Sequence, residues 1–475
     1  MNAGVRYTLN FPSTEANNHG AVFNLRTQKL EYLGQNGFPD TARELHRLNF
    51  GPRIGLAYRT TEKTVIRSAY GIVWIEQAGI TSPFTVPYFP FLQSVTQRTV
   101  DSVNPAFLLS AGPSVAPTGP TPDAGLGQGV FSVDRGLGSG YVQQWNFAVQ
   151  REITTNTSVE LAYAGSIITH VGIPDTNINQ LTAQQLSIGA PLLVNVANPY
   201  FGSIPRSSSL GNPTIPQAQL LKPYPQFTNV TLFRNNVGTT NYNSFQAKIE
   251  QRLSHGLSAL VSYTRSKLID QASSVFDAAI ISGPTANFPA ADTYNRTLER
   301  DVSTGDMPNV MVVAATYEFP LAKQHRYLGG WQLTGILTLQ SGLPLAVTQI
   351  TNFNAFAGFG TQRPNRVSNP ELPASLRSVS KWFDTEAFQV APQFTIGNSS
   401  RNPVRGPAYR NLDLALIKHT KMGEHVDVEF RAETFNFTNT PPLGAPNVVK
   451  GNAAFGTIIA AGDPRVIQFG LKLNF

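Results

Sequence analysis

The chain has no cysteine and little charge. None of its 475 residues is Cys, and only 14% are Asp, Glu, Lys or Arg, against about 25% in an average soluble protein. The lack of Cys excludes disulfide bonds, thiolate nucleophiles and cysteine-ligated metals. No apolar run approaches the ~18 residues of a transmembrane helix. A low content of charged residues without a long apolar run is typical of a membrane protein whose strands expose every second side chain to lipid.

Motifs for catalysis and for nucleic-acid binding are also missing. The net charge of +7 is spread thinly, with no block of five or six like charges, so we expect no nucleic-acid partner. No G-x-S-x-G, H-E-x-x-H, P-loop or dinucleotide-binding fingerprint occurs in a suitable context. The seven His are scattered; His419 and His425 flank one turn and are best interpreted as solvated turn residues. The sequence therefore predicts no enzyme activity, no catalytic or metal site and no cofactor.

The N-terminal ten residues contain neither the apolar core nor the cleavage site of a signal peptide. An exported protein needs such a peptide, so either it was removed or the chain is a piece of a longer protein. Residues 3–9 have the pattern of a strand, which favours the second interpretation, that the chain is a piece of a longer protein.

The last eleven residues, R-V-I-Q-F-G-L-K-L-N-F, have two different faces. Successive side chains of a strand point to opposite faces, so one face is wholly apolar and the other is mostly polar or small. The apolar face consists of Ile467, Phe469, Leu471, Leu473 and Phe475. The closing strand of an outer-membrane barrel has this pattern, and we expect Phe475 to lead recognition by the barrel-insertion machinery. A core strand of a soluble β protein is the alternative.

The same alternation recurs along the chain and predicts about twelve long strands. They are expected at residues 4–10, 53–60, 64–74, 141–151, 157–169, 241–252, 257–267, 309–319, 331–340, around 412–416, 426–433 and 465–475. Short turns near 61, 154, 255, 325 and 422 alternate strictly with long loops near 30, 108, 205, 288, 375 and 450. Transmembrane barrels have short periplasmic turns and longer extracellular loops, whereas a soluble sandwich has no reason to place all long loops at one end.

The lengths and ends of these strands fit a membrane. Eleven residues at ~3.3 Å each, tilted by ~40°, span roughly 28 Å, close to the apolar band of about 25 Å. Aromatic residues lie near the strand ends, as in interfacial girdles: Tyr58, Trp74, Tyr141, Phe319, Trp331 and Phe475. Four apolar residues break the alternation and fall on the expected lumen face: Leu260, Ile336, Ile417 and Phe435.

Two groups of residues are candidates for function. Asp427, Glu429, Arg431 and Glu433 share one strand face; we interpret them as a hydrated lumen wall with paired charges rather than as an acid–base cluster. The long loops combine aromatics with amides and hydroxyls, which suits sugar rings, and the possible substrate residues are Tyr224, Phe227, Phe353 and Phe356. Packing of the loops against each other is the alternative role for these aromatics.

Seven stretches of this chain resemble the C-terminal part of TonB-dependent outer-membrane transporters of the Oar-like type. They run in family order from about residue 49 to the end: N-F-G-P-R-I-G-L-A-Y at 49–58, Q-L-L-K-P-Y-P-Q-F at 219–227, Y-N-S-F-Q-A-K-I-E-Q-R-L-S-H-G-L at 242–257, G-W-Q-L-T-G-I-L-T-L-Q-S-G-L-P at 330–344, R-N-P-V-R-G-P at 401–407, F-R-A-E-T-F-N-F-T-N at 430–439 and A-G-D-P-R-V-I-Q-F-G-L-K-L-N-F at 461–475. The resemblance implies a barrel of about twenty-two strands, preceded by a signal peptide, a small β-sandwich and a plug. None of those preceding parts is visible here, so we expect the first ten or so strands to be missing as well.

Together these patterns predict an all-β fold: a single domain over residues 1–475 that forms a transmembrane antiparallel β-barrel, partial, with about twelve long strands and long extracellular loops. By resemblance, the function is TonB-dependent uptake of a large substrate such as an oligosaccharide or a peptide across the outer membrane. The expected partners are outer-membrane lipid and the insertion machinery, with the TonB system acting only through the missing plug. The alternatives are a soluble all-β binding protein and a passive porin.

Overall fold

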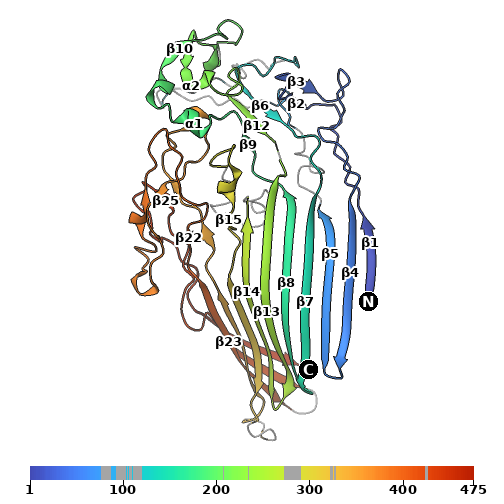
Figure 1. Cartoon of the computed structure of the whole chain (residues 1–475). Helices are drawn as coiled ribbons and strands as arrows, with labels where there is room; N and C mark the ends of the chain where they lie inside the picture. The colour runs from blue at the N-terminus through green and yellow to red at the C-terminus, as the bar shows by residue number, and fades with distance from the viewer. Residues whose placement is uncertain are drawn as a thin grey trace.

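The chain is organised around one large antiparallel sheet. The computed structural model describes residues 1–75, 87–92, 103, 105, 108, 110, 120–206, 208–233, 235–271, 290–320, 325, 328–422 and 426–475. Within these residues the main sheet has 13 strands, of which twelve follow the hydrogen-bonded order β1-β4-β5-β7-β8-β13-β14-β16-β17-β23-β24-β26, while β15 pairs with β14 off this path. Figure 1 shows the long strands side by side in a curved wall.

The strands of the path are mostly nine to seventeen residues long. Their bounds are β1 Asn2–Tyr7, β4 Phe50–Thr61, β5 Thr64–Ile75, β7 Gly140–Thr154, β8 Thr157–Val171, β13 Gly238–Ser254, β14 Leu257–Asp270, β16 Asn309–Glu318, β17 Trp331–Gln340, β23 Tyr409–Lys421, β24 Asp427–Phe435 and β26 Val466–Asn474. The fifteen residues of β7 and β8 give strands of about 50 Å at ~3.3 Å per residue. Even with tilt, these strands are longer than an apolar band of about 25 Å.

The register places the alternating apolar residues of all twelve strands on one face, which we call the apolar face. One row of paired residues across eight strands shows this: Tyr58, Ile66, Val149, Leu161, Ala247, Tyr263, Met311 and Leu339. Further along, Leu416 pairs with Ala432, and Ala432 pairs with Phe469. Leu260, Ile336, Ile417 and Phe435 lie on the opposite, polar face, as their sequence positions predict.

The distribution of burial is inverted relative to a soluble protein. Large apolar side chains of the sheet are widely exposed, for example Phe147 at 49% and Leu161 at 47%. In contrast, the largest fully buried side chains, such as Phe23, Phe388 and Leu181, belong to the loops. A contiguous exposed apolar surface of this extent marks contact with another apolar medium or partner.

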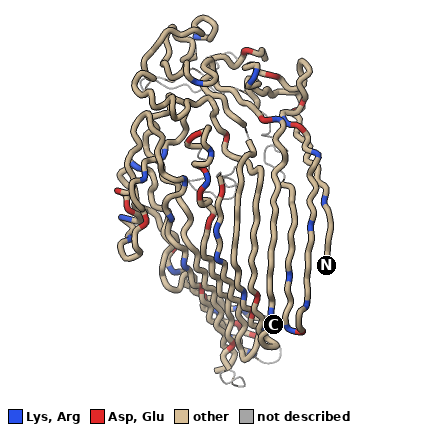
Figure 2. The backbone as a smooth tube through the Cα atoms, viewed as in Figure 1, with Lys and Arg blue, Asp and Glu red and all other residues tan. Residues whose placement is uncertain are grey.

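The connections between strands separate by length. The chain reverses at 62–63, 155–156 and 255–256 through two-residue turns, and Gly256 has the positive φ of +81° that such a turn requires. Long connections at 8–49, 172–237, 341–408 and 436–465 follow the other ends of the strands. In Figure 1 the first two lie at the top, and β22 and β25, which belong to the last two, lie lower at the left. Figure 2 shows long uncharged stretches along the central strands, with charges near the turns and in the loops.

The long connections carry their own small sheets and short helices. The short strands are β2 Ala21–Asn24, β3 Lys29–Tyr32, β6 Gly129–Ser132, β9 Thr176–Asn177, β10 Asn195–Ala197, β11 Thr214–Pro216, β12 Asn229–Leu232, β15 Asp301–Val302, β18 Pro344–Leu345, β19 Thr348–Gln349, β20 Asn365–Arg366, β21 Phe388–Gln389, β22 Val404–Arg405 and β25 Val449–Lys450. The helices are α1 Ala183–Leu186, α2 Gln217–Leu220, and the 3₁₀ turns η2 Ala190–Leu193, η3 Ser209–Gly211, η4 Arg296–Glu299, η5 Ala355–Ala357, η6 Ala374–Leu376 and η7 Thr385–Ala387. Over the described ranges, no helix is both long and apolar enough to cross a membrane.

The all-β prediction is confirmed, and most strand bounds agree within a few residues. The first strand was expected at 4–10 but occupies Asn2–Tyr7, where it pairs with β4. The region 11–48 was interpreted as loop, yet it contains the β2–β3 hairpin, whose apolar residues are buried. The expected turns near 325 and 422 lie partly outside the described residues. No pairing is found between the described strands β1 and β26, which form the two edges of the sheet.

Candidate functional site

The loop layer at one end of the sheet is held together by several small apolar cores. One core joins the β2–β3 hairpin to later loops through Phe23, Tyr32, Val130 and Phe227. A second core joins α1 to the loop that follows β17, through buried leucines and Phe359. Because these contacts link segments as far apart as Phe23 and Phe227, more than two hundred positions along the chain, the loops form one assembled layer.

The predicted substrate aromatics occupy different positions in this layer. Phe227 is buried, and its ring lies edge-on to Phe23 with centroids 4.7 Å apart. Tyr224 also packs edge-on against Phe23, at 5.7 Å. Phe356 lies edge-on to Phe394 at 5.8 Å, while Phe353 is 37% exposed. Packing between loops, the alternative role considered from sequence, therefore describes Phe227 best, and Phe353 presents the most accessible ring.

Burial also changes the acidity of two residues of the 219–227 stretch. Burial lowers the pKa of Lys222 to about 8, because a charged ammonium loses its hydration there. Burial likewise raises the pKa of the Tyr224 hydroxyl. Lys222 is only 8% exposed, which is the cause of its loss of hydration.

Buried ion pairs fasten the β17–β23 loop to the loop between β14 and β16. Arg363 Nη2 lies 2.5 Å from Glu299 Oε2, and both side chains are almost inaccessible. Arg363 Nη1 also donates to the Leu298 carbonyl at 3.2 Å. A second buried pair joins Arg401 to Asp270 at the end of β14. Buried pairs of this kind require mutual compensation, since either charge alone is strongly unfavourable there.

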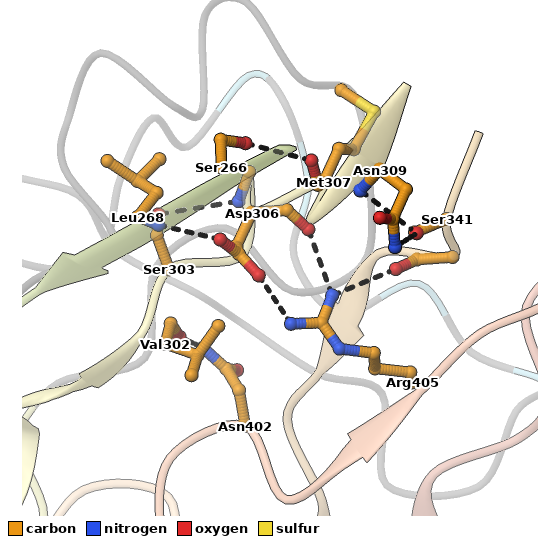
Figure 3. Close-up of polar contacts among 12 residues, drawn as sticks. Ser266, Leu268, Val302, Ser303, Asp306, Met307, Asn309, Ser341, Asn402 and Arg405 are labelled. Carbon is orange, nitrogen blue, oxygen red and sulfur yellow. Dashed lines mark hydrogen bonds and ion pairs between the residues drawn. The ribbon is translucent and has the colours of Figure 1, made fainter. Parts of the chain in front are cut away.

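A third arginine, Arg405, also attaches the loop after β17 to the ends of the neighbouring strands, as Figure 3 shows. The Arg405 guanidinium pairs with the Asp306 carboxylate and donates to the carbonyls of Asp306 and Gly342 at 3.0 and 3.1 Å. The same carboxylate accepts the Leu268 amide at 2.6 Å. Nearby, Asn402 Nδ2 donates to the Val302 carbonyl at 2.7 Å. The loop after β17 is thus bound to the tops of β14 and β16 by a connected polar network.

The four residues predicted to face the lumen lie together on the polar face of β24. Arg431 pairs with Glu429 and lies 3.5 Å from Glu433. Across the strand pair, His419 Nδ1 is 3.8 Å from Asp427 and 3.9 Å from Glu429. The alternating charges therefore pair with one another on the face opposite Val428 and Phe430. The second turn histidine, His425, lies outside the described residues.

Four of the predicted assembly residues form the apolar face of β26, and Phe475 directly follows its last residue. Among the described strands, β26 pairs only with β24. Phe469 stacks on Phe430 at 6.3 Å, while Leu471 and Leu473 remain exposed and the Phe475 ring is fully exposed. An edge strand with an apolar face is a template for further contacts.

Sequence reasoning missed the anchoring arginines. Two of them, Arg401 and Arg405, stand in the stretch R-N-P-V-R-G-P at 401–407, which was used only as evidence of resemblance. Their carboxylate partners Asp270 and Asp306 lie 131 and 99 positions away. The sequence offers one indication: Arg401 and Arg405 have no acidic residue near them in this proline- and glycine-rich stretch. That observation suggests a distant carboxylate partner for each arginine, but it does not say which carboxylate.

Comparison with known proteins adds a family. A search of curated protein sequences gives no match. Among solved structures, the chain is similar to the ferripyoverdine receptor of the outer membrane of Pseudomonas aeruginosa, with 12% identity, a TM-score of 0.41, and coverage of 94% of this chain and 35% of that one. It is also similar to the outer membrane transporter YddB from Escherichia coli, with 10% identity, a TM-score of 0.42, and coverage of 90% and 41%. The chain thus spans less than half the length of these proteins.

The family comparison covers nearly the whole chain. Residues 1–468 match the family described as outer membrane beta barrel domain. This match agrees with the long two-faced strands, the exposed apolar face and the gathering of long loops at one end. The chain belongs to the outer membrane beta barrel domain family, and the protein is located in the outer membrane.

Proposed function

We propose that this chain forms barrel wall and extracellular loops of a TonB-dependent outer-membrane transporter that takes up a large substrate, such as an oligosaccharide or a peptide. The observation that carries the proposal is the layer of long loops fastened over one end of a two-faced sheet. The Oar-like resemblance supports the same class. The outer-membrane location excludes the alternative of a soluble all-β binding protein. Long loops that are fastened to one another at one end of the sheet argue against a passive porin.

The sheet is part of a larger closed barrel in this proposal. Within the described residues, β1 and β26 each pair with one strand of the main sheet, and an edge left open in lipid would leave backbone groups without hydrogen bonds. Further strands would pair with both edges and close the wall, with residues 1–475 contributing one barrel domain. The polar face with Asp427, Glu429, Arg431 and Glu433 then lines the lumen, and the apolar face contacts lipid.

The orientation follows from the loop lengths. Short turns face the periplasm and the anchored loop layer faces outward, as is general for outer-membrane barrels. Coupling to TonB would run through the plug of the full-length transporter, and Phe475 would guide assembly by the insertion machinery. The chain itself supplies no catalytic group and binds no cofactor in this proposal.

The loop layer is the proposed site of substrate recognition. Phe353 offers an exposed ring, Phe356 follows three positions later, and Tyr224 and Phe227 hold the supporting loop in place. Aromatic rings beside amides and hydroxyls bind ligands that carry both apolar patches and hydrogen-bonding groups.

Growth and uptake measurements test this function. A strain lacking the full-length protein should grow poorly on particular oligosaccharides or peptides as sole carbon source, and uptake of those substrates by the parent strain should stop when TonB is inactivated. Substitution of Phe353 and Phe356 by Ala should reduce uptake without reducing the amount of protein in the membrane. Uptake that continues without TonB would refute energised transport, and a growth defect confined to iron limitation would refute the substrate class.

A further inference from the structure

A polar pocket of about 260 Å³ lies within the loop layer and is lined in part by β9, whose place in the fold Figure 1 shows. Four segments that are distant in sequence meet there: 175–180, 229–231, 290–293 and 355–360. The lining residues are Asp175, Thr176, Asn177, Gln180, Asn229, Thr231, Ala290, Thr293, Ala355, Gly358, Phe359 and Gly360. The pocket is therefore a product of the assembled loops and not of any single one.

Asn177 fixes three of these segments relative to one another. Its Nδ2 donates to the Gly358 carbonyl at 3.0 Å and to Asn229 Oδ1 at 3.2 Å. Its Oδ1 accepts the Val230 amide at 3.2 Å and the Asn179 amide at 3.1 Å. The side-chain amide of Asn177 thus holds β9, β12 and the end of η5 at fixed distances around the pocket.

Gln180 fixes the fourth segment. Its Oε1 accepts the Thr293 amide at 2.9 Å and the Thr293 hydroxyl at 2.5 Å. The Tyr294 hydroxyl donates to the Gln180 carbonyl at 2.9 Å. Walls held by such hydrogen bonds are preorganised, and a ligand that enters them loses less free energy to ordering of the protein.

The lining chemistry selects the kind of ligand. Three amide and three hydroxyl side chains surround the space, together with one carboxylate, Asp175, and the Phe359 ring. No Lys or Arg is among the described residues that line it. The carboxylate acts electrostatically on the buried Arg43, which is not part of the lining. Anionic ligands therefore find no positive partner in the pocket, whereas a neutral ring that carries hydroxyls finds donors, acceptors and an apolar wall.

We propose that this pocket binds one neutral sugar ring of an oligosaccharide, which rests on the proposed uptake function and specifies its substrate class. The volume is smaller than the ~300–1,000 Å³ of pockets for drug-sized ligands, so it accommodates a single ring while the rest of the chain extends into the loop layer. The Asn177 amide makes all its hydrogen bonds within the protein, so the amides of Gln180 and Asn229 and the Asp175 carboxylate bind the hydroxyls. Phe359 with Ala290 and Ala355 contacts the C–H face.

Two substitutions test the pocket in the full-length protein, purified in detergent and probed with maltohexaose, cellohexaose, xylohexaose and an array of other neutral glycans. Ala355→Trp fills the pocket from an exposed first position of a 3₁₀ turn and should weaken glycan binding roughly tenfold or more. Thr231→Val removes one hydroxyl while keeping the shape, and the loss of one hydrogen bond predicts about fivefold weaker binding.

Each variant has a matched control. Ala374→Trp makes the same change at the exposed first position of another 3₁₀ turn, and Thr214→Val removes an exposed hydroxyl from β11. Both controls should bind glycans as the unmodified protein does. Binding to some neutral glycan that fails only in the two pocket variants supports the proposal.

Several outcomes would overturn it. Binding confined to peptides or to anionic iron chelates, or glycan binding that Ala355→Trp leaves unchanged, rejects the sugar pocket. If TonB-dependent uptake of a carbon source persists in Ala355→Trp at the normal rate, the pocket assignment fails while the transport function stands. If the full-length protein supports no energised uptake at all, the proposed function fails independently of the pocket.

Discussion

The buried pair between Arg363 and Glu299 makes the loop anchoring testable. In Arg363→Met, the Glu299 carboxylate keeps the hydrogen bond that it accepts from the Ala291 amide at 2.9 Å and its electrostatic interaction with Arg296, but it loses the guanidinium that lies 2.5 Å away. The carboxylate side chain is 4% exposed, so water does not replace the guanidinium unless the loop opens. We expect the loop after β17 to open far more often in this variant.

The size of the effect follows from the cost of an uncompensated buried charge. Removing one partner of a buried pair costs about 3–5 kcal/mol. With about 1.4 kcal/mol for each factor of ten, the population of the locally open state rises roughly 100- to 5,000-fold. The hydrogen bonds of this pair join loop residues (Ala291, Leu298 and the pair itself), so the long strands of the sheet should keep their stability.

Limited proteolysis of the full-length protein in outer-membrane vesicles measures this opening. Cleavage within residues 341–408 should accelerate by about the same factor when opening and closing are fast relative to cleavage. Lys381→Met is the matched control in the same loop: its pair with Asp384, at 3.9 Å, is exposed, and such pairs contribute about 0–1 kcal/mol.

A double substitution separates the charge from the packing. Replacing both partners by Met removes the uncompensated carboxylate, so cleavage in Arg363→Met/Glu299→Met should return towards the rate of the unmodified protein. The reasoning would be refuted if Arg363→Met were cleaved no faster than Lys381→Met, or if the double variant were cleaved as fast as the single one.

Three further predictions concern packing, titration and assembly. A Cβ added to Gly165 would lie 2.6 Å from the Trp145 ring, so Gly165→Ala should lower the free energy of unfolding by about 1–3 kcal/mol. Urea titrations followed by Trp fluorescence measure this change. The control Gly55→Ala, with open space around the added Cβ, should leave the free energy of unfolding unchanged. The pKa of Lys222 is lowered to about 8; the folded state therefore binds fewer protons than the unfolded state above pH 8, and resistance of this loop to proteolysis should rise between pH 8 and 9.5 and become independent of pH in Lys222→Met. Deleting Phe475 from the full-length protein should lower its level in purified outer membranes, and unchanged insertion would contradict its role as an assembly signal.

The strands could be predicted because one simple physical pattern governs them. Period-two alternation over ten or more residues has no other common cause, and it located β17 at Trp331–Gln340 as found. The same alternation assigned Leu161 and Tyr163 to one face and Leu260 to the other. Strand ends were less certain, because β13 and β8 continue past the alternating region into the loop layer.

The loop layer could not be predicted, because its contacts follow no sequence period. The hairpin β2–β3 has strands of four residues, too short for an alternation to stand out. The partners Arg401 and Asp270 are far apart in the chain and are paired by the folded loops alone. Phe227 illustrates the limit: an aromatic in a polar loop can bind a ligand or fill a core, and only its contact with Phe23 distinguishes the two.

The central claim is that alternate residues of the long strands face lipid and lumen, and the absence of native Cys allows a direct measurement. Single-Cys variants at Glu160, Leu161, Ala162 and Tyr163 of β8 can carry a nitroxide in the full-length protein, reconstituted in lipid vesicles. Collision with oxygen should be high at Leu161 and Tyr163, and collision with a water-soluble nickel chelate should be high at Glu160 and Ala162. Equal accessibility at all four positions, or the reverse alternation, would contradict the account.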